Sequence, residues 1–169
     1  TRTTGLAMTP AYASPEQLRR ETLTTASDVY SLGVVLFELI SGTRPFQLAG
    51  LSPAQSERMV CETMPPTLRR ALSDGELLPQ ERITRLRAVH GDLERIVAQA
   101  LHKDPIQRYG SAQALADDLG RYLEGRPVLA HPDSASYRIG KFLRRHRLGS
   151  ALAALAIATV LAALATALW

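Results

Sequence analysis

Apolar residues recur at helical spacing through most of the chain, and no segment alternates in the manner of a strand. The clearest amphipathic pattern opens at Asp92, where these apolar residues share one helix face: Leu93, Ile96, Val97, Ala100 and Leu101. A similar pattern follows Ser111, a residue suited to a helix N-cap, and Gly125 closes it. The periodicity predicts a mainly α-helical fold.

The segment that begins near Ser27 differs from these because it is apolar almost all round. Its apolar residues are Val29, Leu32, Val34, Val35, Leu36, Phe37, Leu39 and Ile40. Gly42 is expected to end this helix. A helix without a polar face is normally buried inside a larger domain.

Helix-capping signals predict further short helices. Ser14, Pro15 and Gln17 have the spacing of a capping box with proline at the first helical position. Ser52 followed by Pro53 predicts a helix within 48–64. We expect 65–90 to be irregular with helical pieces, 126–132 to be a linker, and 134–147 to form a short amphipathic helix.

The last twenty residues, 150–169, carry no charge, and seventeen of them are apolar. This length suffices for a helix that crosses the hydrocarbon core of a bilayer. Because the segment lies at the end of the chain, it is not a cleaved signal peptide. We therefore predict a transmembrane helix at 150–169, while a buried or fraying alanine-rich helix is the alternative.

The positive charge is concentrated next to this apolar segment. The net charge is +4, and five basic residues without an acidic one lie within ten positions: Arg138, Lys141, Arg144, Arg145 and Arg147. The rest of the chain holds 15 basic and 16 acidic residues, so no basic domain for nucleic acid is present. We expect the basic block to face an anionic leaflet and to hold the preceding residues in the cytoplasm, as a single-pass protein of the cell membrane.

Metal and disulfide chemistry are not indicated. The only cysteine is Cys61, which excludes an internal disulfide and a multi-cysteine zinc site. The four histidines have no metal-ligand spacing, so we expect no metal site. The first residue is Thr1, which suggests a fragment or a processed product.

Three segments together resemble the C-terminal lobe of eukaryotic-like Ser/Thr protein kinases, and the likeness covers about 1–124. The first, 8–16 (MTPAYASPE), is similar to the end of the activation segment. The second, 27–46, opens with SDVYSLGVVLFEL and is similar to the buried central helix of that lobe and its following loop. The third combines KDP at 103–105 with Arg108 and Tyr109.

The resemblance implies roles for individual residues. Thr9, Pro10 and Tyr12 would position the protein substrate, and Thr3 and Thr4 would be candidate phosphorylation sites. Glu16 and Arg108 would form a buried ion pair. Asp28 would hold the backbone of the catalytic loop and is expected to be left unpaired here, whereas Gly33 belongs to the central-helix motif.

The same resemblance defines what is missing from the 169 residues. They contain no glycine-rich phosphate loop, no HRD motif and no DFG motif, the parts that bind ATP and Mg²⁺ in this family. We therefore expect no catalytic, cofactor-binding or metal residue here. By itself, this chain should be inactive, with ATP and Mg²⁺ used only by an intact parent that includes the missing N-terminal lobe.

The region after the lobe resembles the juxtamembrane segment of bacterial receptor-like kinases. The implied organisation is a partial kinase domain at 1–124, a linker and basic juxtamembrane segment at 125–149, and the span at 150–169. The implied function is transfer of the ATP γ-phosphoryl group to Ser or Thr hydroxyls of proteins in signal transduction. The alternative is a non-catalytic, membrane-anchored helical interaction module or pseudokinase.

Overall fold

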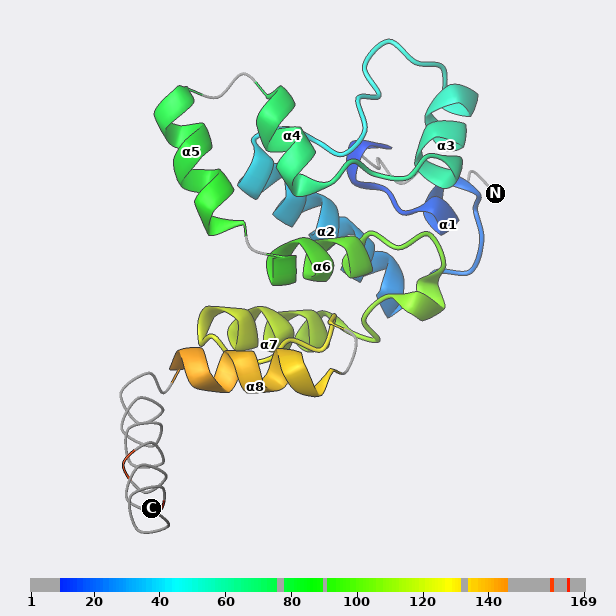
Figure 1. The fold of residues 1–169 in the computed structure, drawn as a ribbon. Helices are drawn as coiled ribbons and strands as arrows, with labels where there is room; N and C mark the ends of the chain where they lie inside the picture. The colour runs from blue at the N-terminus through cyan, green and yellow to red at the C-terminus, as the bar shows by residue number, and fades with distance from the viewer. Residues whose placement is uncertain are drawn as a thin grey trace.

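The structure is a computed structural model that describes residues 10–75, 78–89, 91–131 and 134–145, together with Thr159 and Leu164. Its elements, shown in Figure 1, are η1 (Pro10–Tyr12), α1 (Pro15–Leu18), α2 (Thr25–Ser41), α3 (Pro53–Glu62), α4 (Leu68–Asp74), α5 (Pro79–Ala88), α6 (Gly91–Ala100), η2 (Pro105–Gln107), α7 (Ala112–Leu123) and α8 (Ala135–Arg145). The described part of the chain contains no strand, which confirms the mainly α-helical prediction.

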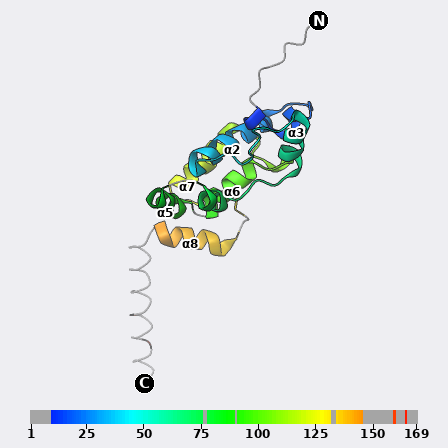
Figure 2. The ribbon, with the colours of Figure 1, turned by 90° about the horizontal axis from the view of Figure 1, so that it is seen from above.

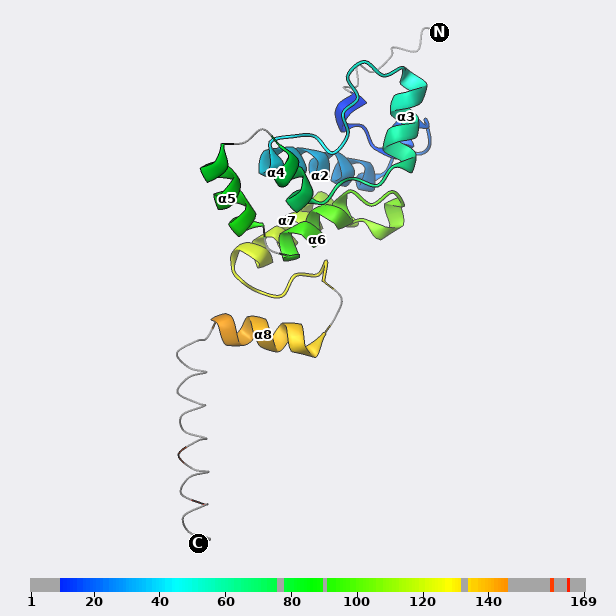
Figure 3. The ribbon, with the colours of Figure 1, turned by 45° about the horizontal axis from the view of Figure 1, so that its top comes forward.

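Helix α2 is the centre of the fold and contacts η1, α4, α6, η2 and α7. It begins with a capping box in which the Thr24 hydroxyl accepts from the backbone while the Ser27 hydroxyl accepts from the Thr24 N–H. It ends at Gly42, whose φ of 78° lies in the left-handed region that glycine adopts without strain. Helices α4, α6 and α7 pack against α2 (Figures 1 and 3).

Helices α2 and α6 pack closely at Gly33. A Cβ atom added there would lie 2.9 Å from the Cβ atom of Ala100 and 3.2 Å from Leu101 Cδ2. The absence of a side chain at Gly33 therefore sets how near the two helices can lie.

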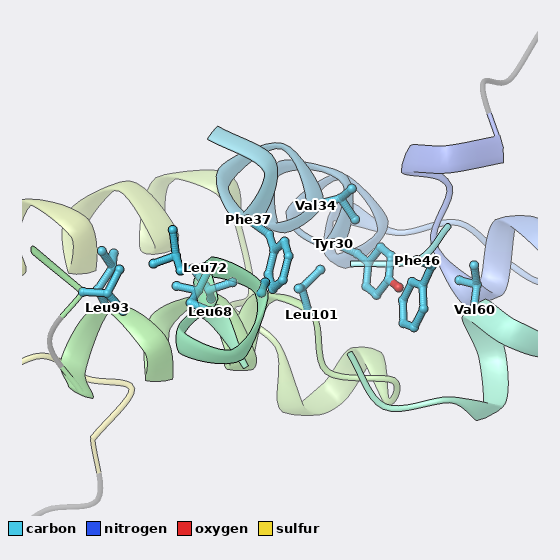
Figure 4. Close-up of a cluster of buried hydrophobic side chains, with 12 residues drawn as sticks. Tyr30, Val34, Phe37, Phe46, Val60, Leu68, Leu72, Leu93 and Leu101 are labelled. Atoms are coloured by element: carbon cyan, nitrogen blue, oxygen red, sulfur yellow. The ribbon is translucent and has the colours of Figure 1, made fainter. Parts of the chain in front are cut away.

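The larger core cluster runs along one side of α2 (Figure 4). Tyr30, Val34 and Phe37 supply the α2 face of this cluster and are each at most 1% exposed. Side chains from the surrounding elements complete it: Phe46, Val60, Leu68, Ala71, Leu72, Val89, Leu93, Val97 and Leu101. A smaller cluster holds Val29, Ile96, Ala100, Tyr109, Leu115 and Val128. The apolar spacing of α6 thus serves both clusters.

The structure agrees with the capping signals and with the helical pieces expected in one segment. Ser14 and Gln17 form the predicted capping box of α1, and Ser52 caps α3. The region 65–90, expected to be irregular with helical pieces, contains two helices, α4 and α5. Leu68 and Leu72 of α4 are buried against α2, so tertiary packing stabilises a helix too short to form alone.

Helix α8 lies at the edge of the helical lobe, away from α1 and α3 (Figures 1 and 2). The segment 126–131 returns between α7 and α8 (Figure 3). The predicted membrane span at 150–169 lies outside the described residues, except for Thr159 and Leu164. Within the described ranges, no helix combines the length and apolar character that a membrane crossing requires.

Candidate functional site

A buried ion pair fastens the N-terminal end of the lobe to its base. Arg108 Nη1 donates to Glu16 Oε1 at 2.7 Å, and Arg108 Nη2 donates to Glu16 Oε2 at 3.0 Å. The side chains are 0% and 4% exposed, respectively. Arg108 also donates to the backbone carbonyls of Ala26, His102 and Lys103. One guanidinium therefore joins the start of α1, the start of α2 and the loop after α6.

The surroundings of Glu16 favour its ionised form. Burial alone would raise the pKa of this carboxyl, but the Arg108 guanidinium, the backbone N–H of Glu16 and the Ser27 hydroxyl together lower the pKa to about 2. The Ser27 hydroxyl donates to Oε1 at 2.7 Å. A buried charge is tolerated when its hydrogen-bonding capacity is met in this way.

Tyr12 is held against α2 by polar contacts at both its backbone and its side chain. Its hydroxyl donates to Glu38 Oε2 at 2.7 Å, and its carbonyl accepts from the Ser31 hydroxyl at 2.8 Å. The Arg44 guanidinium lies 5.3 Å from the centre of the Tyr12 ring and also pairs with Glu38. These contacts fix 10–12 in position before any substrate arrives.

A surface groove of about 660 Å³ lies beside this fixed segment. Its lining combines an apolar floor with three arginines: Ala11, Leu18, Arg19, Arg20, Arg44, Leu48, Ala49, Leu51, Pro53, Ser56 and Glu57. Ala11 links the groove directly to Tyr12. The arrangement can hold an extended peptide with apolar and acidic side chains.

The remaining predicted residues are distributed as follows. Thr3, Thr4 and Thr9 lie outside the described residues, and Pro10 opens η1. Asp28 lies in the first turn of α2, is exposed, and has no hydrogen-bond or ion-pair partner within the described ranges. Its exposure removes the desolvation cost that an unpaired buried carboxylate would carry. Gly33 is the close-approach point between α2 and α6.

Lys103 has a structural role that the sequence did not reveal. Its ammonium group lies 4.4 Å from the centre of the Phe46 ring and 5.8 Å from that of Tyr30, and it donates to the Val60 carbonyl. Burial lowers the pKa of Lys103 to about 8, and the nearby Arg108 and Arg19 charges act in the same direction. The KDP motif at 103–105 contains Lys103, but the sequence does not show that Phe46 and Tyr30 lie beside it.

A second buried carboxylate, Asp118, holds the segment after α7. It is 0% exposed and accepts hydrogen bonds from the Tyr109 hydroxyl at 2.8 Å and from the backbone N–H groups of Leu129 and Ala130 at 2.6 and 3.0 Å. Burial and the bond to Asp118 raise the pKa of Tyr109. The segment 126–131 is therefore bound to the lobe by specific contacts.

Lys141, which we expect to face an anionic leaflet, forms an ion pair with Asp92 at 2.5 Å, with side chains 20% and 10% exposed. This contact joins α8 to the start of α6. Arg138 is exposed. The side chains of Arg144 and Arg145, and all of Arg147, lie outside what the structure describes.

The described residues offer no set of side chains for a metal. No cluster of three or more His, Cys, Asp or Glu side chains suited to a metal occurs within these ranges. Cys61 is buried, burial raises the pKa of its thiol, and its Sγ donates to the Pro15 carbonyl. Because these residues hold no cluster of ligands for Mg²⁺, we derive no catalytic step from them.

Comparison with known proteins agrees with this architecture. The protein kinase domain family matches residues 1–119. The chain is 38% identical over 128 residues to the serine/threonine-protein kinase PknB of Mycolicibacterium smegmatis, a match covering 75% of this chain and 18% of that protein. It is 35% identical over 111 residues to the serine/threonine-protein kinase pkn3 of Myxococcus xanthus, covering 66% and 18%.

The helical lobe centred on α2, with its Glu16–Arg108 anchor, is thus that of a protein kinase, and the chain belongs to the protein kinase domain family. A probable serine/threonine-protein kinase of Streptomyces coelicolor is also similar, at 33% identity over 128 residues. The chain spans less than a fifth of the length of these curated relatives.

Proposed function

We propose that this chain is the C-terminal lobe of the kinase domain of a membrane-anchored Ser/Thr protein kinase. In the intact protein, the kinase would transfer the ATP γ-phosphoryl group to Ser or Thr hydroxyls of protein substrates in signal transduction. The family membership and the similarity to proteins named as serine/threonine-protein kinases support this proposal. The N-terminal portion of the domain would supply the residues that bind ATP and Mg²⁺.

One observation of the fold carries the proposal. The central helix α2 leaves an apolar strip uncovered, with Leu32, Val35 and Leu39 exposed by 44%, 40% and 71%. These residues are spaced three and four positions apart and therefore lie along one face. A central helix with an uncovered apolar face is expected when further elements of the same domain pack on it. We assign this face to the preceding part of the kinase domain.

The groove beside 10–12 is the proposed site of the protein substrate. Thr9, Pro10 and Tyr12 would place the acceptor residue, and the peptide on one side of it would lie over Leu18, Leu48 and Leu51. The contacts that fix Tyr12 on α2 support this assignment, because a positioned hydroxyl acceptor needs a rigid frame. The candidate phosphorylation sites Thr3 and Thr4 would lie upstream in the same segment.

The activity is tested by comparing this chain with the parent protein that includes the upstream sequence. We expect the parent to phosphorylate a Ser/Thr protein substrate with ATP and Mg²⁺, and this chain alone to give no phosphorylation and no saturable ATP binding by calorimetry. Thr9→Ala in the parent should reduce phosphorylation, whereas Thr84→Ala, on exposed α5, should not. An inactive parent that still binds protein partners would favour the interaction-module alternative.

Membrane anchoring is proposed from the sequence of 138–169. The segment 150–169 would span the membrane, and the preceding basic block would keep the kinase lobe in the cytoplasm. The test places a reporter active only outside the cytoplasm after Trp169 and, in a second fusion, before Thr1. We expect activity from the first fusion alone. Activity from the N-terminal fusion, or none from the C-terminal one, would contradict this topology.

A further inference from the structure

A second surface cavity, of about 820 Å³, lies where α7, the segment 126–131 and α8 meet. Its lining is Arg121, Arg126, Pro127, Val128, Leu129, Ala130, His131, Tyr137 and Arg138. Three of these nine residues are arginines, and none is acidic. A concave site with several convergent cationic groups is suited to an anion. Nothing in the proposed kinase reaction uses this cavity. Helices α7 and α8, which contribute to its lining, lie on the side of the lobe away from α1 and α3 (Figure 1).

The walls of the cavity are held in place without a ligand. Asp118 binds the N–H groups of Leu129 and Ala130 from behind, and the Val128 N–H donates to the Tyr137 hydroxyl at 3.1 Å. The His131 and Tyr137 rings stack with centroids 3.8 Å apart and an interplanar angle of 5°. A site whose walls are already fixed loses little conformational freedom on binding.

The cationic groups exceed the acidic ones at this site. Arg121, in the last turn of α7, is half-buried, and its guanidinium has no hydrogen-bond or ion-pair partner among the described residues. Arg126 pairs through Nε with Glu124, which is 59% exposed. A guanidinium carries five N–H donors, so this pair leaves donors for a further oxygen ligand. The negative charge of Asp118 lies behind the wall and is already bound by three donors.

We propose that this cavity binds the phosphate headgroup of an anionic phospholipid. The proposal deepens the proposed membrane anchoring and rests on it for the presence of a bilayer. Arginine suits a phosphate because its planar fork can contact two phosphate oxygens at once. Arg121 and Arg126 would contact the phosphate, and the Arg138 side of the cavity would contribute positive potential.

Two features favour a lipid over a soluble phosphate. Apolar side chains stand exposed at the cavity and next to it: Leu129 is 65% exposed, and Ile139, which follows Arg138 on α8, is 59% exposed. Such residues gain free energy in the interface of a bilayer. In addition, only four residues, 146–149, separate α8 from the uncharged segment 150–169. Four residues reach at most about 14 Å, so the C-terminal end of α8 would remain close to the headgroups. Arg138, at the cavity, lies about 10 Å from that end along the helix.

The test measures lipid binding by the complete chain in non-ionic detergent. This measurement does not depend on how the chain is oriented in a membrane. Calorimetric titrations use dioctanoyl phosphatidylglycerol, dioctanoyl phosphatidylcholine and inorganic phosphate. We expect saturable binding of the anionic lipid, with weaker binding of the other two. Arg121→Gln with Arg126→Gln should lower the affinity for the anionic lipid by about tenfold or more, because charge-assisted hydrogen bonds are lost.

The matched control is Arg58→Gln with Arg69→Gln, which removes the same charge from exposed positions on α3 and α4. This variant should bind the anionic lipid within about twofold of the unmodified chain. Circular dichroism melts establish that both variants are folded. Equal losses in the two variants would overturn the proposal in favour of diffuse charge attraction. Inorganic phosphate binding as tightly as the lipid would overturn the assignment to a lipid. An inactive parent kinase with intact lipid binding would contradict only the proposed function.

Discussion

Glu16 and Arg108 are 92 positions apart in the sequence, yet their side chains meet at two points inside the lobe. The two residues differ in how many other groups they bind. Glu16 has Arg108 and the Ser27 hydroxyl as side-chain partners, whereas Arg108 also satisfies three backbone carbonyls. The arginine therefore organises more of the lobe than the carboxylate does.

This inequality gives a prediction for single and double substitutions. Glu16→Ala and Arg108→Ala should each lower the free energy of unfolding by about 3–5 kcal/mol, because each leaves a buried charge unpaired. Arg108→Ala should cost more, since three carbonyls also lose their donor. The double variant should be less destabilised than the sum, measured by thermal and denaturant melts. Additive losses would show that the two side chains are not coupled, and the exposed pair Arg58 and Glu62 serves as a control with little effect.

The low pKa of Glu16 predicts how the stability of the fold changes at acidic pH. Its folded pKa of about 2 lies below the ordinary 4.5, so the unfolded chain binds the proton more readily. The ionised pair therefore stabilises the fold above pH 4.5, and this contribution is lost as the pH falls toward 2. The difference in the free energy of unfolding between the unmodified chain and Glu16→Gln should therefore become smaller as the pH falls from 4.5 to 2. Parallel curves from pH 6 to pH 2 would contradict the assignment.

The lowered pKa of Lys103 predicts how the stability of the fold changes at alkaline pH. Its folded pKa of about 8 lies below the ordinary 10.5, so between these values the unfolded chain binds more protons. The contribution of Lys103 to the free energy of unfolding should therefore rise with pH from 8 to 10.5. Denaturant melts of the unmodified chain and of Lys103→Arg, which keeps its charge, provide the comparison. If the difference in the free energy of unfolding between these two proteins is constant from pH 8 to 10.5, titration of the Lys103 ammonium does not change stability in this range.

Gly33 and Gly120 offer a matched pair of glycine substitutions. Gly33→Ala should destabilise the fold by about 1–3 kcal/mol, because the new Cβ would lie 2.9 Å from Ala100 Cβ across the α2–α6 contact. Gly120→Ala, within α7, meets no atom within 4 Å and should stabilise the helix by about 0.5–1 kcal/mol. Denaturant melts of both variants measure the difference. Equal effects would mean that the α2–α6 contact is not tight at Gly33.

Asp118 and Asp117 provide a similar comparison for the segment after α7. Asp118→Ala leaves the Tyr109 hydroxyl and two backbone N–H groups without their acceptor, at a cost of about 1–3 kcal/mol for each group left buried. Hydrogen exchange of the Leu129 and Ala130 amides should accelerate. The neighbouring Asp117 is exposed and binds only Gln113, so Asp117→Ala should leave both measurements almost unchanged. Unaltered exchange in Asp118→Ala would show that this carboxylate does not hold the segment.

Local signals in the sequence determined the helices that begin at strong caps. Ser14 and Gln17 specify a helix start because their hydroxyl and amide side chains bind backbone N–H groups only a few residues away. Ser52 acts in the same way, and Pro53 suits the first helical position. The all-round apolar pattern from Val29 to Ile40 likewise indicated a central helix, which α2 is. The motifs at Glu16 and Arg108 could be matched to a known family because their order and spacing are themselves sequence properties.

Only the tertiary structure decided which distant groups meet. Lys103 lies over Phe46 and Tyr30, Asp118 binds Leu129 and Ala130, and Lys141 pairs with Asp92. None of these contacts has a sequence signal, because each depends on how helices with interchangeable apolar faces pack together. The same reason explains α4 and α5, whose residues have weak local patterns and become helical where α2 and α4 supply packing partners. The sequence alone therefore specified the helical lobe and its kinase motifs, whereas the packing decided that Lys141 and 126–131 contact the lobe.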